Sequence, residues 1–132
     1  MINVRRNVVM TGLLLCQLLV VPAIAGDVVS VKLMTLELAR DIAQGAIDAC
    51  RKDGYQVSVV VVDRSGRTLV LMREVFANQD LTVVALGKAN AVILSGTGSG
   101  ALRENGAEIA DEVTLLGNLV VVDGGLPMRV AG

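Results

Sequence analysis

Apolar and polar positions recur with a helical period across residues 36–53, LELARDIAQGAIDACRKD. One side of this segment is apolar and the opposite side is charged or polar, as in a helix that packs on a core. Thr35 is suited to cap the first turn, and Gly54 is suited to end the last one. The pattern therefore predicts an amphipathic helix whose apolar face consists of Leu36, Ala39, Ile42, Ala43, Ala46, Ile47 and Cys50.

Two β-branched runs follow, VSVVVV at 57–62 and TLVLMRE at 68–74. The short DRSG link between them predicts an antiparallel hairpin, in which Asp63 accepts hydrogen bonds from its own turn. The first run shows little alternation, which is typical of a strand buried on both faces.

A second helix is predicted over 81–94, LTVVALGKANAVIL. Its valines are typical of a strand, but its length and its alanines favour a helix with Asp80 as the N-cap. Gly87 and Ala91 lie four positions apart, so they would form a small-residue patch that packs closely on the sheet.

The remaining segments are shorter. Residues 101–105 could form a helix capped by Ser99, and the segment from 106 to 118 has the composition of a loop. LVVV at 119–122 predicts a third strand, and MRV at 128–130 predicts the start of a fourth. Helices that flank antiparallel strands define an α+β fold.

Residues 1–25 have the composition of a secretory signal peptide. Two arginines precede an apolar stretch at 8–21, and AIA at 23–25 offers small residues for cleavage. The apolar stretch is shorter than the ~20 residues of a spanning helix, so we expect no stable membrane span after cleavage. An uncleaved membrane anchor is the alternative. The expected product is a periplasmic or secreted domain at 26–132.

Charge and composition narrow the function classes. The chain has 12 basic and 13 acidic residues, which argues against a nucleic-acid surface. After removal of the signal peptide, Cys50 is the one cysteine, and its place on the apolar helix face favours burial over reactivity. The chain has no histidine, which excludes a Ser-His-Asp triad, Cys-His catalysis and His-bearing zinc sites.

Other groups that could carry chemistry each have a structural alternative. GTGSGA at 96–101 fits the letters of a dinucleotide-binding loop, but a turn between two helices explains it as well. The carboxylates of Glu108, Asp111 and Glu112 lack the spacing of a calcium loop and are typical of a solvated loop. Met72 and Met128 are typical core residues, and Tyr55 is typical of a packing residue with its hydroxyl in water.

Three ordered segments resemble the GlcG/HbpS-like proteins, a group that includes the PduO C-terminal domain. They are MTLELARDIAQGAIDACRKDGYQVSVVVVDRSGRTLVLMRE, LGKANAVILSGTGSGAL and GGLPMRV, and the stretch from the first to the last of them spans about 100 residues. The resemblance implies a profilin-like fold, an antiparallel sheet with helices on both sides. It also implies homo-oligomers and haem binding in some members. Members continue past the Gly-Gly-x-Pro loop with a strand and a C-terminal helix, so we expect this chain to be truncated at its C-terminus.

The first functional hypothesis is an exported protein that binds haem or another small ligand and has no self-contained catalytic centre. The ligand would lie between the second helix and the loop at 124–127. The residues expected near it are Arg73, Lys88, Gly124, Gly125 and Arg129. No catalytic or metal-binding residues are assigned. Met72, Met128, Tyr55 or Cys50 could ligate haem iron, since histidine is absent. The alternatives are a haem-degrading enzyme or oxidoreductase, and a structural assembly domain without a ligand.

Overall fold

The computed structural model describes residue 26, residues 29–106 and residues 115–129. The chain divides into two units, Met1–Val31 and Lys32–Gly132, and the described helices and strands all belong to the second unit. The expected signal peptide at 1–25 lies outside the described residues, as do the carboxylates of Glu108, Asp111 and Glu112.

The first predicted helix is confirmed as α2, Leu36–Lys52. Its start is fixed by Thr35, whose side chain accepts a hydrogen bond of 3.3 Å from the Leu38 amide. Its end is followed by Gly54 at φ +81°, a left-handed conformation that glycine adopts without steric cost. The buried face presents Ala39, Ala43 and Ile47, as the apolar period predicts.

The predicted hairpin is also confirmed. Strands β1 (Ser58–Val62) and β2 (Thr68–Arg73) pair antiparallel, with Val60 opposite Leu71. The Asp63 carboxylate accepts hydrogen bonds from the amides of Ser65 (2.7 Å) and Arg67 (3.0 Å), so it caps its own turn. The expectation that the first strand is buried on both faces is wrong, because only Val61 of β1 is buried.

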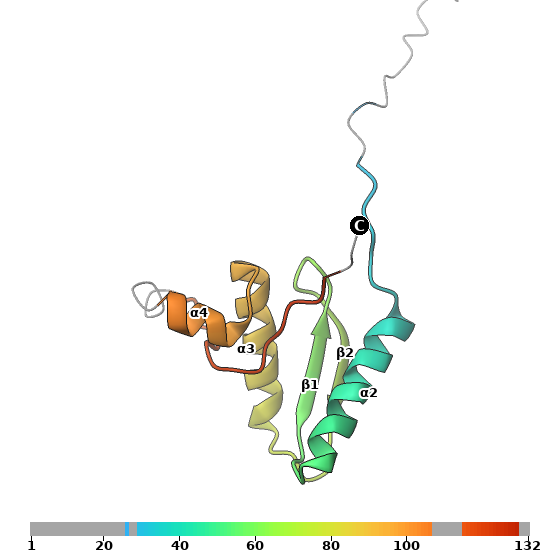
Figure 1. Ribbon diagram of the computed structural model, residues 1–132, viewed down its shortest axis with the longest axis vertical. Coiled ribbons are helices and arrows are strands. Elements are labelled where there is room, and N and C mark those ends of the chain that lie inside the picture. The colour runs from blue at the N-terminus through green and yellow to red at the C-terminus, as the bar shows by residue number, and fades with distance from the viewer. Residues whose placement is uncertain (1–25, 27–28, 107–114, 130–132) are drawn as a thin grey trace, which may run out of the picture. The chain divides into compact units, whose positions relative to one another are not determined.

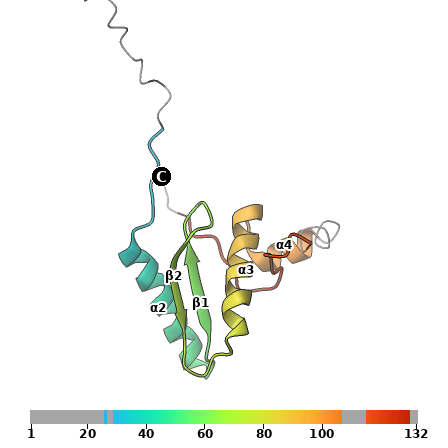
Figure 2. The ribbon, with the colours of Figure 1, turned by 180° about the vertical axis from the view of Figure 1, so that it is seen from behind.

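The hairpin lies between α2 and α3 (Figures 1 and 2), and helix α2 contacts both strands whereas α3 contacts β1. The core is therefore built from small α2 residues against the sheet: Ala39 and Ala43 meet Val61 and Val70. Met72 packs against this cluster, as expected of a core methionine. The α+β class is confirmed.

The second and third predicted helices are α3 (Asp80–Ser95) and α4 (Ser99–Asn105). Asp80 is not the N-cap but the first helical residue, and its own amide donates to the Asn78 side chain at 3.0 Å. Because GTGSGA starts after a helix rather than a strand, the turn between helices is confirmed and the dinucleotide-binding interpretation is wrong.

Among the described residues, no single helix has the length and apolar composition to cross a membrane. The pair α3 and α4 passes that test together, but its two helices are bent by 62°.

The third predicted strand at 119–122 is wrong. These residues belong to a segment without regular secondary structure, here called the strap (residues 118–129), that packs on α3 without joining the described two-stranded sheet. The Val120 amide donates to the Gly87 carbonyl at 3.1 Å, and the Asn90 side chain donates to the Asn118 carbonyl at 3.0 Å. The strap thus finds partners on a helix instead of a strand.

The small-residue patch of α3 explains this arrangement. Gly87 is buried, and a Cβ there would lie 2.5 Å from Val120 Cγ2, so only glycine admits the strap at this distance. The expectation that Gly87 serves packing on the sheet is therefore corrected, because it receives the strap. The start of a fourth strand at 128–130 is also wrong for residues 128 and 129, which are in no strand, and residue 130 lies outside the described part.

Candidate functional site

A glycine loop within the strap is fastened by one buried hydroxyl, that of Ser99. This side chain is fully buried, donates to the Val122 carbonyl at 2.5 Å and accepts from the Gly125 amide at 2.9 Å. The Ser99 amide in turn donates to the Gly125 carbonyl at 3.0 Å. Ser99 is not the N-cap of α4, a place that Gly98 takes, but the first helical residue and the anchor of the loop.

The loop needs glycine at both of its central positions. A Cβ on Gly125 would lie 2.9 Å from the Ser99 hydroxyl and 3.0 Å from the Lys88 carbonyl. Gly124 has φ +112°, which L-residues rarely adopt, and a Cβ there would lie 3.2 Å from the Lys88 ammonium. The side chain of Lys88 therefore extends over the backbone of Gly124.

The structure brings together three of the five residues predicted to lie near the ligand, Lys88, Gly124 and Gly125, which are in direct contact. Arg129 lies about two helical turns further along α3, where it donates to the Gly96 carbonyl at 2.5 Å. Their role in binding stays a prediction. Lys88 and Arg129 form no ion pair with another described residue.

One ion pair lies beside this loop. Asp123 pairs with Arg103 of α4 at 3.7 Å, and both side chains are mostly exposed. Since these two charges offset each other, Lys88 and Arg129 give the described part of the loop region a net positive charge. Such a surface favours an anionic ligand group.

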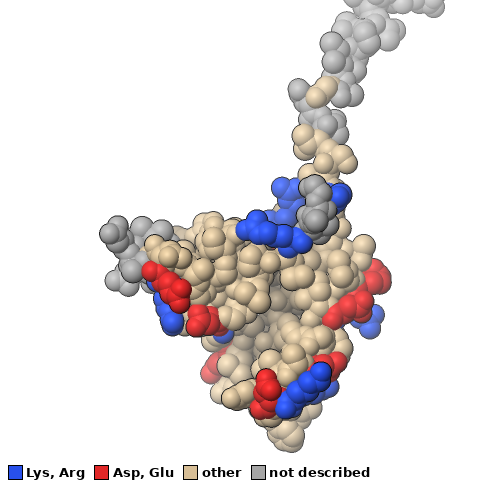
Figure 3. All heavy atoms as spheres, viewed as in Figure 1, with Lys and Arg blue, Asp and Glu red and all other residues tan. Residues whose placement is uncertain are grey.

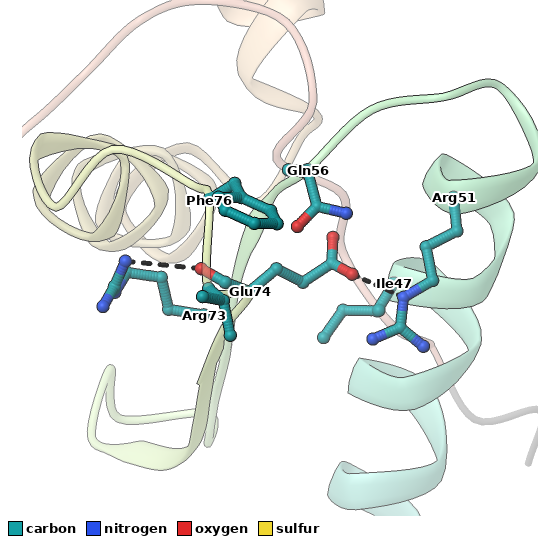
Figure 4. A pocket seen from close by; sticks show the side chains of 7 residues that line it. Ile47, Arg51, Gln56, Arg73, Glu74 and Phe76 are labelled. Atoms are coloured by element: carbon teal, nitrogen blue, oxygen red, sulfur yellow. Dashed lines mark hydrogen bonds and ion pairs between the residues drawn. The ribbon is translucent and has the colours of Figure 1, made fainter.

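Arg73 lies elsewhere. It lines an open pocket of about 370 Å³ at the end of the hairpin, together with Ile47, Arg51, Gln56, Glu74, Val75 and Phe76. Figure 4 shows the Glu74 side chain directed toward Arg51 of α2, whereas the Arg73 side chain lies on the other side of Glu74. The Arg73 guanidinium donates to the carbonyls of Ala77 (2.6 Å) and Glu74 (3.3 Å), so it braces the turn after β2.

Glu74 is the one acidic side chain that is buried among the described residues. One of its carboxylate oxygens accepts from Arg51 Nε, and the other accepts from the Val57 amide at 3.1 Å. The hydrogen bond from Arg51 is the main reason why the pKa of Glu74 lies below its ordinary value, although burial opposes the shift. Because both oxygens are engaged inside the protein, this carboxylate ties α2 to the hairpin and is not free for a ligand.

The candidate haem ligands differ in exposure. Met72 is packed against the core and Cys50 is a half-buried free thiol, so the expected burial of Cys50 is only partly met. Tyr55 and Met128 are 66% and 60% exposed, so the expectation that Met128 is a core residue is wrong. No group of three or more cysteine or acidic side chains in the described part could hold a metal ion.

These residues fit haem held at a surface better than haem inside a histidine-lined pocket. Met128 presents an accessible thioether, which is one of the axial ligand types of haem iron. It is next to Arg129 in the strap, and Leu126, which is 77% exposed, supplies apolar surface near Gly98.

The buried hydroxyl allows a first prediction. Ser99→Ala removes the partners of the Gly125 amide and the Val122 carbonyl, so we expect a loss of about 1–3 kcal/mol in unfolding free energy. Ser95→Ala is the matched control. The Ser95 hydroxyl donates to the Ala91 carbonyl of its own helix at 2.8 Å and accepts from the Thr97 amide at 3.2 Å, and it forms no hydrogen bond with the glycine loop.

The measurements are denaturant unfolding and amide hydrogen exchange by NMR. In Ser99→Ala the Gly125 amide should exchange faster relative to the protein as a whole, and in Ser95→Ala it should not. Equal Gly125 exchange in the two variants would contradict the anchoring role of Ser99.

Sequence patterns could not show two features of this region. Ser99 and its partner Val122 are 23 positions apart, as are Arg51 and Glu74, and neither pair has a local spacing signal. The only sequence signal for the role of Glu74 is its position as a charged residue at the end of a mostly apolar strand.

Comparisons with known proteins give the same picture of the fold. A family model described as "Haem degrading protein HbpS-like" matches residues 34–132. A crystal structure of HbpS is 32% identical and superposes with a TM-score of 0.74, covering 83% of this chain and 77% of that one. A Streptomyces reticuli HbpS variant with two Glu→Asp substitutions is also 32% identical, with a TM-score of 0.75 and coverages of 85% and 76%.

A third structure agrees in fold alone. The Klebsiella pneumoniae protein ORFY is 22% identical, with a TM-score of 0.71 over 79% of this chain and 74% of that one. No curated protein matches the sequence significantly.

Proposed function

The chain belongs to the HbpS-like family, and from this membership we propose that it is an exported protein that binds haem beside α3 and the glycine loop. The proposal includes no self-contained catalytic centre. We take haem as the ligand because the family model is described as a haem-degrading protein.

The observation that supports this site best is the position of Lys88 over Gly124. Gly124 has no side chain that could block the Lys88 ammonium, and Lys88 forms no ion pair in the described part of the chain. The ammonium can therefore bind a carboxylate of a ligand. Arg129 offers further N–H donors, since only one nitrogen of its guanidinium is engaged by Gly96. These two side chains would bind haem propionates.

The rest of the site would orient the ring. Leu126 and Met128 are exposed apolar residues between Gly124 and Arg129 in the strap, and Met128 could ligate the iron. Haem itself supplies iron and its redox chemistry when bound. The protein's part is to hold the carboxylates, to cover one face of the ring and to keep the loop in place through Ser99.

Export and assembly are part of the same proposal. The composition of residues 1–25 supports a periplasmic or secreted protein, and the lone half-buried Cys50 needs no partner in an oxidising compartment. Homo-oligomers are what the resemblance implies. The second candidate is a haem-degrading enzyme, which the family description favours.

Haemin titration followed at the Soret band tests the proposal. We expect the native protein to shift this band, and Lys88→Met to bind haemin about tenfold or more weakly, the usual loss for a charge-assisted hydrogen bond. Lys52→Met is the control, because Lys52 is an exposed lysine in the last turn of α2, away from the loop.

Two results would decide against parts of the proposal. Unchanged haemin affinity in Lys88→Met would remove Lys88 from the site, and no Soret shift in the native protein would remove haem as the ligand. Addition of ascorbate in air separates the two candidate functions: protein-dependent loss of the Soret band would favour the degrading enzyme over a binding protein.

A further inference from the structure

Three arginines from two distant segments meet at one end of the fold. Arg64 and Arg67 are exposed in the turn between β1 and β2. This turn touches α3, because a Cβ on Gly66 would lie 3.8 Å from the Ile93 side chain. Arg129 reaches the same end of α3 through the Gly96 carbonyl. Figure 3 shows basic side chains gathered where the turn and the last described residues lie.

The charges of these arginines are only partly offset by the described acids. None of the three forms an ion pair with another described residue. Asp63 in the same turn accepts hydrogen bonds from the amides of Ser65 and Arg67, and its single negative charge offsets at most one of the three arginines. The end of α3 contains no basic residue of its own, and its dipole, equivalent to about half a negative charge, offsets only part of three positive charges.

The same end is apolar as well as basic. Ile93 and Leu94 of α3 are 40% and 57% exposed there. A surface that combines guanidinium groups with exposed aliphatic side chains suits a ligand that is itself apolar and carries anionic groups. It suits a fully hydrated polyanion less, because the aliphatic side chains would stay exposed to water.

We propose that Arg64 and Arg67 act with Arg129 as the carboxylate-binding end of the ligand site, so that this end selects apolar planar molecules that carry carboxylates. The inference rests on the proposed haem-type function and adds two residues of the hairpin turn to it. Arginine is suited to this task because its planar guanidinium binds a carboxylate through two parallel hydrogen bonds. Lys88 would then hold the ligand further along the strap.

A pair of probes isolates the carboxylates: haemin, and haemin dimethyl ester, which has the same ring system but no free propionate. We expect the native protein to bind haemin at least about tenfold more tightly than the diester. In the double variant Arg64→Gln/Arg67→Gln this preference should shrink to about threefold or less, through weaker binding of haemin alone. The double variant Arg40→Gln/Lys52→Gln makes the same charge change on exposed positions of α2 and should keep the preference.

The outcomes distinguish this inference from the function on which it rests. If the native protein binds neither probe, the proposed function fails. If it binds both equally, haem-type binding stands and the carboxylate-binding end is wrong. If the preference falls equally in both double variants, net charge rather than the turn arginines controls binding, and the inference is overturned. Thermal unfolding of each variant confirms that the comparison concerns folded protein.

Discussion

Gly87→Ala is expected to lower the free energy of unfolding by about 1–2 kcal/mol, even though alanine is the better helix former. The new Cβ would lie 2.5 Å from Val120 Cγ2 and 3.1 Å from the Val120 backbone nitrogen. The strap cannot retreat without losing the hydrogen bond from the Val120 amide to the Gly87 carbonyl. Overpacking a closed contact costs about 1–3 kcal/mol, and an approach of 2.5 Å places this substitution in the upper part of that range, so the helix propensity gain of up to about 1 kcal/mol offsets only part of the cost.

Gly45→Ala provides the control for the same substitution. Gly45 lies within α2 and is exposed, and a Cβ there would meet nothing within 4 Å. We expect this variant to gain up to about 1 kcal/mol, as for glycine replaced in an open helix position. Denaturant unfolding of both variants shows whether each substitution raises or lowers the free energy of unfolding. A stabilising Gly87→Ala would show that the strap is not closely packed against Gly87.

The elements that the sequence predicts correctly are those with a local signal. The helix at 36–53 has a complete apolar face and a capping threonine, and the hairpin has two β-branched runs joined by a short turn. Each of these elements is specified by residues that are close together in the chain. Their secondary structure therefore does not depend on which distant residues they contact.

The strap shows why the last third could not be predicted in the same way. LVVV has the composition of a strand, but composition does not identify the partner of its backbone amides. The partner of Val120 is Gly87 on α3, and the small side of that helix is equally suited to pack on a sheet. A β-branched segment such as LVVV could therefore either pair with a strand or pack on the glycine of a helix. Only contacts between residues distant in the sequence decide between the two.

The sequence predicted the proximity of some candidate residues and not of others, while their role in binding stays a prediction. The expectation of a site between the second helix and the glycine loop placed Lys88, Gly124 and Gly125 together, because Gly-Gly and a lone helix lysine are visible in the sequence. Arg73 was wrongly assigned to this site, because the order of the predicted strand and helix already places it beside the start of α3, where it donates to the Ala77 carbonyl. The anchoring role of Ser99 could not be predicted from the sequence, because its hydrogen-bond partners are distant residues of the strap.

Glu74→Gln is expected to destabilise the protein near neutral pH. It should also weaken the pH dependence of stability in the acid range, because the variant lacks this titrating carboxyl. The hydrogen bond from Arg51 holds the pKa of Glu74 below its ordinary value of 4.5 in the folded chain. For a carboxyl with a lowered folded pKa, the stabilisation is fully present above the unfolded value. It is lost as the pH falls from about 4.5 through the folded pKa, because the unfolded chain takes up its proton before the folded chain does.

Thermal unfolding measured from about pH 7 down to about pH 3 tests this sign. The native and Glu74→Gln midpoints should differ most near neutral pH and converge in acid, because the native carboxyl is then protonated as well. Asp41→Asn is the control, an exposed acid of α2 that forms no ion pair with another described residue, and its curve should follow the native one. Parallel curves for the native protein and Glu74→Gln would show that the Arg51 contact does not stabilise the ionised carboxylate, and that α2 is held to the hairpin by the apolar core alone.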